Sequence, residues 1–237
     1  MIFNITNETF GGPVRMGDLL AVCNVVEHLR QKFGENVKFH MLPGSIYQAE
    51  HCNKFYNLLL TITDYFSETT GQIPLGWKNV NLWDYRDISG DLVKIKNDKT
   101  KEKKIVIFPL FDSKYNTYRN WPNHICLDIL NTYNKPEFSE YSKFVCTNEK
   151  IPVEQFGYTN STDFIENINH IMTSSVFVGG DTGTTHFAFS LIDGPKHLEY
   201  VGSSRALVHT LPFYLMQGKG KFTNYWLDME GSDFRTQ

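Results

Sequence analysis

Short apolar runs alternate along this chain with longer stretches in which apolar residues recur every three or four positions. Near the N-terminus, Ile2 to Ile5 is such a run, the stretch from Asp18 to Gly34 has helical periodicity, and Val37 to Leu42 is typical of a second strand. A strand, a helix and a second strand in this order form a βαβ unit, whose strands pair in parallel. The pattern therefore predicts an α/β fold built on a parallel sheet.

The alternation resumes in the second half of the chain with the buried-strand signature Ile105-Val106-Ile107-Phe108. After it we expect helices at 122–132, 161–172 and 186–191, and strands at 144–146, 176–178 and 198–201. Residues 91–104, which contain six lysines and no periodicity, predict an exposed linker, although a surface loop within one domain has the same composition. The expected architecture is two Rossmann-like α/β lobes, residues 1–100 and 101–237, with a cleft between them.

The composition narrows the classes of function. The 237 residues carry a formal net charge of −3 and the isoelectric point is near 6.2, so non-specific nucleic-acid binding is not expected, although a local basic patch is compatible with these values. Four cysteines, none of them in a CxxC pair, indicate free thiols. No run reaches the roughly 18 apolar residues of a membrane span. The N-terminus lacks a signal-peptide layout, which predicts a cytoplasmic location (the host cytoplasm for a phage-encoded chain).

The strongest candidate for a functional site is the segment from Val176 to Leu191, VFVGGDTGTTHFAFSL. A buried strand ends in two glycines, and a turn then leads into a helix whose N-terminal N–H groups and partial positive charge attract phosphate. Glycine allows a close backbone approach or a positive φ angle. Side-chain donors are added by Thr182, Thr184, Thr185 and His186. An ordinary capped helix is the alternative that these residues leave open.

This segment resembles the donor-site motif of the heptosyltransferase-like glycosyltransferases, family nine in the usual classification, whose two Rossmann-like lobes form a GT-B fold. The family carries an Asp-Thr/Ser-Gly-x-x-His-x-Ala run after a strand, which is matched here by Asp181, Thr182, Gly183, His186 and Ala188. The resemblance implies that this segment holds the diphosphate of a nucleotide-sugar donor. It implies no cofactor besides that donor, and no acidic metal-binding motif is evident in the sequence.

Arg15-Met16-Gly17-Asp18-Leu19-Leu20 resembles the family's Met-Gly-Asp turn at the start of its first helix. By resemblance, Gly17 belongs to the binding site and Asp18 is the general base that accepts the proton of an acceptor hydroxyl. Capping of its own helix is the alternative role for Asp18. Both roles are compatible, because a helix N-terminus also keeps a carboxylate ionised.

Tyr118-Arg119-Asn120-Trp121-Pro122 resembles the family's basic-x-Trp-Pro segment. Arg119 stands where the family usually has Lys, and a cation there neutralises the charge that grows on the leaving diphosphate. A solvated surface charge is the alternative for Arg119. Trp121 and Pro122 are expected to pack in the core and not to bind a ligand.

Val201-Gly202-Ser203-Ser204 resembles the family's Phe-Gly-x-Thr segment, which adds Gly202 and Ser203 to the residues expected near the nucleotide. This chain is shorter than members of the family usually are. The missing residues fall mainly in the N-terminal lobe, which in the family normally supplies contacts to the acceptor. The resemblance therefore supports a nucleotide-sugar donor more strongly than it identifies an acceptor.

The expected reaction is an inverting transfer of the sugar to a hydroxyl acceptor, either a saccharide or a modified DNA base. The Asn-, Lys-, Tyr- and Phe-rich composition is typical of a phage chain, and some phages glycosylate hydroxymethylated pyrimidines. A DNA face would use the linker lysines and nearby aromatic residues, which are Lys94, Lys96, Lys99, Lys101, Lys103, Lys104, Trp77, Trp83 and Tyr85. A non-catalytic nucleotide- or sugar-phosphate-binding protein and a nucleotide-sugar epimerase or hydrolase are the alternatives from other classes.

Overall fold

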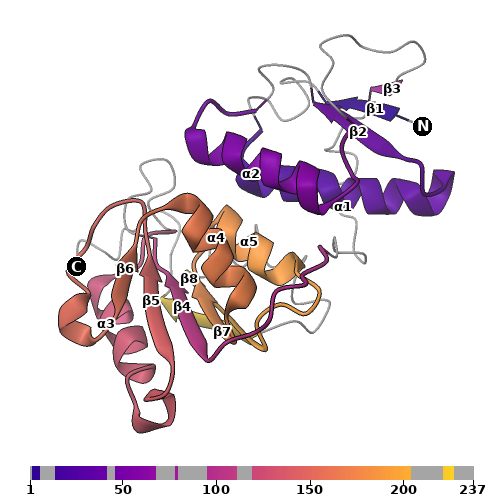
Figure 1. Cartoon of the computed structure of the whole chain (residues 1–237). Helices are drawn as coiled ribbons and strands as arrows, with labels where there is room; N and C mark the ends of the chain where they lie inside the picture. The colour runs from indigo at the N-terminus through magenta and orange to yellow at the C-terminus, as the bar shows by residue number, and fades with distance from the viewer. Residues whose placement is uncertain are drawn as a thin grey trace. The chain divides into compact units, whose positions relative to one another are not determined.

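The chain divides into two compact units, Met1–Lys96 and Asn97–Gln237, close to the boundary expected at residue 100. A computed structural model describes residues 2–5, 14–41, 46–67, 78–79, 95–110, 119–203 and 221–226. The first unit is drawn in indigo and purple in Figure 1, and the second runs from magenta to yellow. Both units have α/β architecture.

The second unit contains a parallel sheet of six strands in the order β6-β5-β4-β7-β8-β9. Counted along the chain from β4, this order is 3-2-1-4-5-6, which is that of a doubly wound, Rossmann-like sheet. The predicted α/β fold with a parallel sheet is therefore confirmed for this unit. Its strands are Lys104–Phe108 (β4), Ser142–Cys146 (β5), Thr159–Ser161 (β6), Val176–Gly179 (β7), His197–Ser203 (β8) and Lys221–Trp226 (β9).

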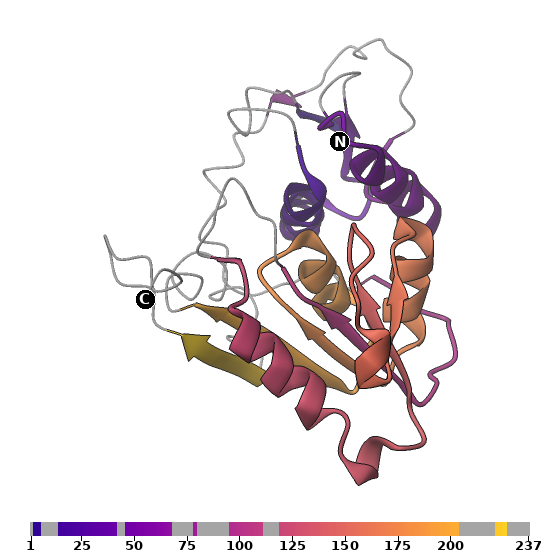
Figure 2. The same ribbon diagram turned by 90° about the vertical axis from the view of Figure 1, so that its left-hand side faces the viewer.

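Helices cover both faces of this sheet (Figure 2). They are α3 (Asn123–Thr132), α4 (Phe164–Thr173) and α5 (Gly183–Ser190), with 3-10 turns η4 (Pro136–Phe138) and η5 (Glu154–Phe156). On one face, α3 packs Ile125 and Ile129 against Ile107 and Val178 of the sheet. Strand side chains alternate between faces, so Phe108 and Phe177 lie on the other face, where α4 and α5 pack and where their rings are 6.0 Å apart.

The first unit is a smaller layer of the same kind. Its parallel strands have the order β2-β1-β3, and they are Lys38–Met41, Ile2–Ile5 and Lys78–Asn79. Helix α1 (Met16–Phe33) buries Leu19, Cys23 and Val26, and α2 is Glu50–Ile62. Gly34 caps α1 with φ of 91°, a conformation that favours glycine, and this confirms the predicted helix end. No helix in the described ranges has the length and apolar character of a membrane span.

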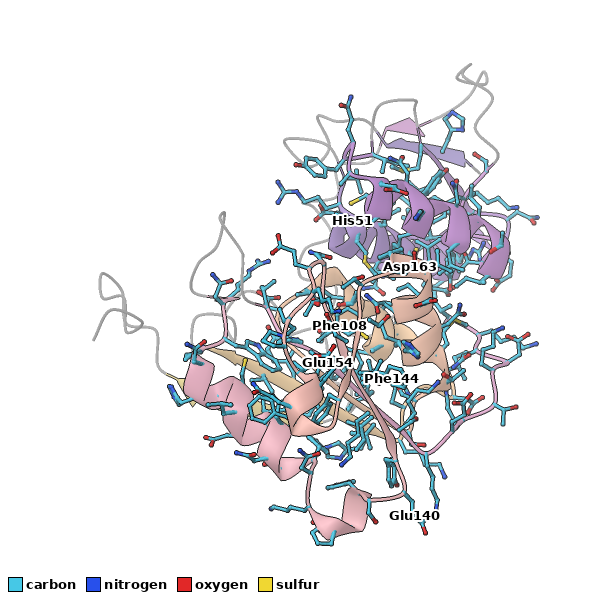
Figure 3. The ribbon with its side chains drawn as sticks, turned by 60° about the vertical axis from the view of Figure 1, so that its left-hand side comes forward. His51, Phe108, Glu140, Phe144, Glu154 and Asp163 are labelled. Atoms are coloured by element: carbon cyan, nitrogen blue, oxygen red, sulfur yellow. The ribbon has the colours of Figure 1, made fainter. Side chains whose placement is uncertain are left out.

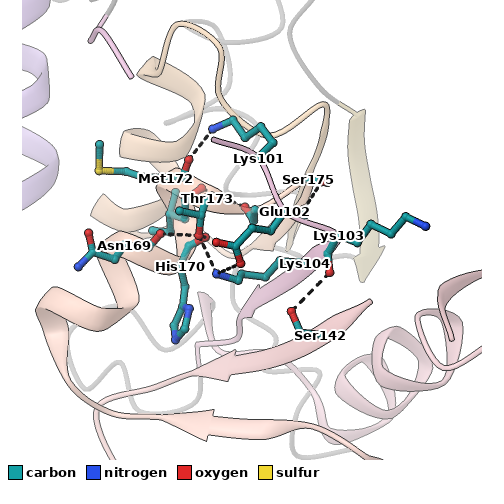
Figure 4. A network of polar contacts seen from close by, with 12 residues as sticks. Lys101, Glu102, Lys103, Lys104, Ser142, Asn169, His170, Met172, Thr173 and Ser175 are labelled. Atoms are coloured by element: carbon teal, nitrogen blue, oxygen red, sulfur yellow. Dashed lines mark hydrogen bonds and ion pairs between the residues drawn. The ribbon is translucent and has the colours of Figure 1, made fainter. Parts of the chain in front are cut away.

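The lysine-rich segment is built differently from the expected exposed linker, because residues 97–104 belong to the second unit. The buried amide of Asn97 donates to the carbonyl of Met172 over 2.9 Å, and the Lys101 ammonium donates to the same oxygen. Lys104 is a residue of β4, and its Nζ lies 2.7 Å from Thr173 Oγ1, as Figure 4 shows. These cations cap the C-terminal end of α4, where positive charge is stabilising.

Arg30 connects the end of α1 to the chain around β2 and α2. Its Nε donates to the carbonyl of Val37 over 3.1 Å, and its terminal nitrogens contact the carboxylate and the carbonyl of Asp64 at 3.0 and 3.2 Å. The guanidinium carbon lies 4.9 Å from the centre of the Tyr65 ring. Since Arg30 is 7% exposed, these contacts satisfy a buried charge.

Replacing Arg30 with Ala should lower the free energy of unfolding by about 3 kcal/mol, because it leaves the buried carbonyl of Val37 without its donor. Urea denaturation followed by circular dichroism measures the change. Lys32→Ala is the matched control, since Lys32 is an exposed cation in the same helical turn. Equal stability of the two variants would show that the Arg30 contacts contribute nothing.

Candidate functional site

The centre of the six-stranded sheet has the topology at which open α/β sheets bind ligands. β4 and β7 are neighbours, with Phe108 opposite Gly179. The chain leaves β4 toward α3 on one face and leaves β7 toward α5 on the other. Ligands of such folds bind at the carboxyl edge, at the point where neighbouring connections run to opposite faces. Here this switch point lies between β4 and β7. Figure 3 labels Phe108, which lies at this edge.

Two glycines at the end of β7 allow side chains to approach from both faces. A Cβ atom on Gly179 would overlap Thr185 Oγ1 and would lie 2.7 Å from the Phe177 ring, and a Cβ on Gly180 would lie 2.7 Å from Trp121 Nε1. Neither glycine has a positive φ angle. The role of this glycine pair is therefore close packing of the protein's own side chains.

Helix α5 begins at Gly183, earlier than the predicted start at His186, so the whole Thr-rich motif lies at its first turn. Thr182 is the N-cap, and its Oγ1 accepts from the Thr185 N–H over 3.4 Å. Thr182 Oγ1 also lies 2.7 Å from Thr184 Oγ1. Thr184 and Thr185 are buried, whereas Thr182 and Gly183 are half-buried. Helix α5 is therefore capped by Thr182, as in an ordinary helix. This cap is compatible with anion binding, because the first N–H groups of a helix have no intrahelical acceptor.

Three charged or titratable side chains meet beside this helix end. Arg119 Nε lies 2.8 Å from Asp181 Oδ2, and His186 Nε2 lies 3.8 Å from Asp181 Oδ1. Asp181 is 3% exposed, whereas the side chains of Arg119 and His186 are 31% and 21% exposed. Arg119 precedes α3, and the other two residues follow β7. The structure therefore unites these predicted residues and places Arg119 in an ion pair.

The surroundings of His186 keep its imidazole uncharged at neutral pH. Burial lowers its pKa below the usual 6.5, the nearby Arg119 lowers it further, and the Asp181 carboxylate opposes both effects. Protonation of His186 therefore requires a pH below the usual 6.5. In its neutral form, a histidine ring still donates one hydrogen bond.

Gly202 and Ser203 lie at the same carboxyl edge, at the end of β8. β8 is the neighbour of β7, and Gly179 pairs with Tyr200, so the two predicted residues extend past the end of β7. The pairing of β8 with β9 is irregular between Gly202 and Ser203. The Ser203 side chain and Ser204 lie outside the described residues.

Gly17 and Asp18 belong to the first unit, in the first turn of α1. Asp18 Oδ2 accepts from the Arg15 N–H over 2.9 Å, so this carboxylate caps its own helix. The exposed guanidinium of Arg15 lies 5.1 Å from the centre of the exposed Tyr47 ring. No local pattern around Tyr47 predicted this contact, which depends on the pairing of Val14 with Ile46.

The indole N–H of Trp121 is a polar group beside this site that the sequence does not predict. The Trp121 ring packs in the core beneath α3 and is 3% exposed, which confirms the expected packing role. Its Nε1 has no hydrogen-bond partner among the described residues and lies against Gly180. The direction of an indole N–H depends on the neighbouring elements, so the sequence held no signal for it.

Comparisons with models of known families, with curated proteins and with solved structures found no match to this chain. Within the described residues, no group of three His, Cys, Asp or Glu side chains is placed to hold a metal ion. The site thus consists of the capped end of α5, the Arg119–Asp181 ion pair and the neutral His186 ring, at the switch point of the parallel sheet.

Replacing Thr182 with Val should lower the free energy of unfolding by about 1 kcal/mol, because Val has the same shape and no oxygen to accept from the Thr185 N–H. Thr182→Ser keeps the oxygen and should change stability by only a few tenths of a kcal/mol. Thermal unfolding of the two variants distinguishes them. If Val and Ser variants melt together, the Thr182 cap does not stabilise α5.

Proposed function

We propose that this protein is an inverting glycosyltransferase that moves a sugar from a nucleotide-diphosphate donor to a hydroxyl acceptor. The observation that carries the proposal is the convergence of Arg119, Asp181 and His186 on the N-terminal end of α5 at the sheet's switch point. Helix N-termini and arginine side chains both favour phosphate oxygens. The resemblance of three short segments to the heptosyltransferase-like family supports the same function.

In the proposed complex, the diphosphate lies against the first turn of α5. The N–H groups of Gly183 and Thr184 donate to its oxygens, and the Arg119 guanidinium and the His186 ring add donors from the side. Gly202 and Ser203 lie near the nucleoside. These fixed donors stabilise the negative charge that develops on the departing diphosphate, which is the main demand of glycosyl transfer without a metal.

The transfer step itself is a single displacement at the anomeric carbon. The acceptor oxygen forms the new C–O bond, and its proton passes to the Asp18 carboxylate. The bond between the anomeric carbon and the phosphate oxygen breaks, and its electron pair leaves with the nucleoside diphosphate. Attack from the side opposite the leaving group inverts the anomeric centre. The two-lobed GT-B architecture is part of this proposal.

A saccharide is the acceptor that we propose in preference to DNA. The lysines expected to form a DNA face are partly engaged elsewhere: Lys103 pairs with Glu140, Lys101 donates to a helix carbonyl, and Lys104 is buried against Glu102. Lys96 and Lys99 are exposed. Lys94, Trp77, Trp83 and Tyr85 lie outside the described residues. A lysine already paired within the protein contributes little to phosphate binding.

A nucleoside diphosphate should raise the melting temperature of the protein, because a ligand that binds only the folded state stabilises it. A thermal-shift screen with ADP, UDP, GDP, CDP and dTDP identifies the base. Arg119→Ala should weaken the best ligand about tenfold or more, as expected for loss of a charged donor. The control is Lys99→Ala, an exposed cation of the same unit. Absence of any shift with every diphosphate would refute the donor site.

Asp18→Asn should leave nucleoside diphosphate affinity unchanged and slow sugar transfer at least about a hundredfold, because an amide cannot accept the acceptor's proton. Asn keeps an oxygen for the Arg15 N–H, so the helix cap is retained. Labelled nucleotide sugars offered with saccharides, with hydroxymethylated duplex DNA, or with no acceptor separate transfer from hydrolysis. Transfer at the wild-type rate would exclude Asp18 as the base. Donor binding without any transfer by the wild type would favour a non-catalytic binding protein.

A further inference from the structure

The Asp181 carboxylate lies beside the proposed diphosphate site although it has the same sign of charge as the ligand. Its side chain is 3% exposed, which leaves almost no surface for direct contact with a ligand. By Coulomb's law, a carboxylate in this place weakens the binding of an anion. We therefore expect an effect of Asp181 that favours anion binding and offsets this repulsion.

The two oxygens of Asp181 face two different partners. Oδ2 lies 2.8 Å from Arg119 Nε, and Oδ1 lies 3.8 Å from His186 Nε2. Arg119 approaches from the connection that follows β4, and His186 approaches from α5 after β7. Asp181 thus joins side chains that arrive from opposite sides of the switch point. The pair engages Nε of the guanidinium, a planar group whose N–H donors match the geometry of phosphate oxygens.

We infer that Asp181 is a positioning residue that holds Arg119 and His186 in place, so that both present donors to the same diphosphate, and that it does not itself contact the ligand. The inference rests on the proposed diphosphate site at α5. It replaces the expectation from the family resemblance that Asp181 itself binds the donor. Arg119 has a long side chain with four rotatable bonds to order, and a fixed partner lowers the entropy that binding must remove.

Asp181→Asn tests this role, because it removes the charge and keeps nearly the same shape. Inorganic pyrophosphate is the probe, and isothermal titration calorimetry measures its affinity for the folded variants. We expect the affinity to fall about tenfold or more, although the site has lost a repulsive negative charge. A tighter complex would mean that Asp181 acts only as a repulsive charge, and an unchanged affinity would mean that its role is structural. Either result overturns the inference.

Asp181→Glu provides a second test that does not depend on the Asn variant's folding. It keeps the charge and moves the carboxylate by one methylene, so positioning predicts weaker binding and a pure charge effect predicts no change. Asp163→Asn is the control, because Asp163 caps α4 in the same unit by accepting from the Glu166 N–H over 2.9 Å. This control should bind pyrophosphate as the wild type does.

The pH dependence of pyrophosphate affinity is a third test, because a purely structural role of Asp181 would leave it unchanged. Protonated His186 binds an anion better, so wild-type affinity should rise as the pH falls through the His186 pKa. The Asp181 carboxylate raises that pKa, and Asp181→Asn should therefore displace the rise to lower pH. Comparison of variants at each pH cancels the titration of pyrophosphate itself. If the wild type binds no pyrophosphate, the proposed function fails; if it binds and the Asn variant has the same affinity and profile, only the positioning role fails.

Discussion

The parallel pairing of β4 with β7 is the constraint on which the candidate site depends. Phe108 lies opposite Gly179, so the connection after β4 and the start of α5 begin at the same edge of the sheet. The strand order sends these two connections to opposite faces. Arg119 and His186, which are distant along the chain, meet at Asp181 for this reason.

Close packing at the end of β7 is the second requirement. Thr185 Oγ1 lies over Gly179 from the α5 side, and Trp121 Nε1 lies over Gly180 from the α3 side. A larger residue at either position would push α5 or Trp121 away from the strand. The distances between Asp181 and its two partners depend on both elements, so the electrostatic geometry is a consequence of the absent side chains at these glycines.

Charge in the second unit follows the polarity of its helices. Every crossover helix in a parallel α/β sheet ends near the amino edge and begins near the carboxyl edge. Lys101 and Lys104 accordingly lie at the C-terminal end of α4, where the helix dipole favours cations, and the proposed anion site lies at the N-terminal end of α5. The buried Asp181 carboxylate, next to the N-terminal end of α5, follows the same division, and its pairing with Arg119 keeps the charge compensated.

Apolar periodicity along the chain predicts the α/β class, the parallel pairing and the strands and helices with a strong pattern, such as Ile105 to Phe108. It missed β6, because Thr159–Ser161 is polar and has no apolar run, and it placed the start of α5 too late, because a Gly- and Thr-rich turn has no helical periodicity. The assignment of residues 97–104 to the second unit and the contacts of Asp181 with Arg119 and His186 come from the folded structure alone. These contacts depend on strand order and on packing between distant segments, and periodicity along the chain encodes neither.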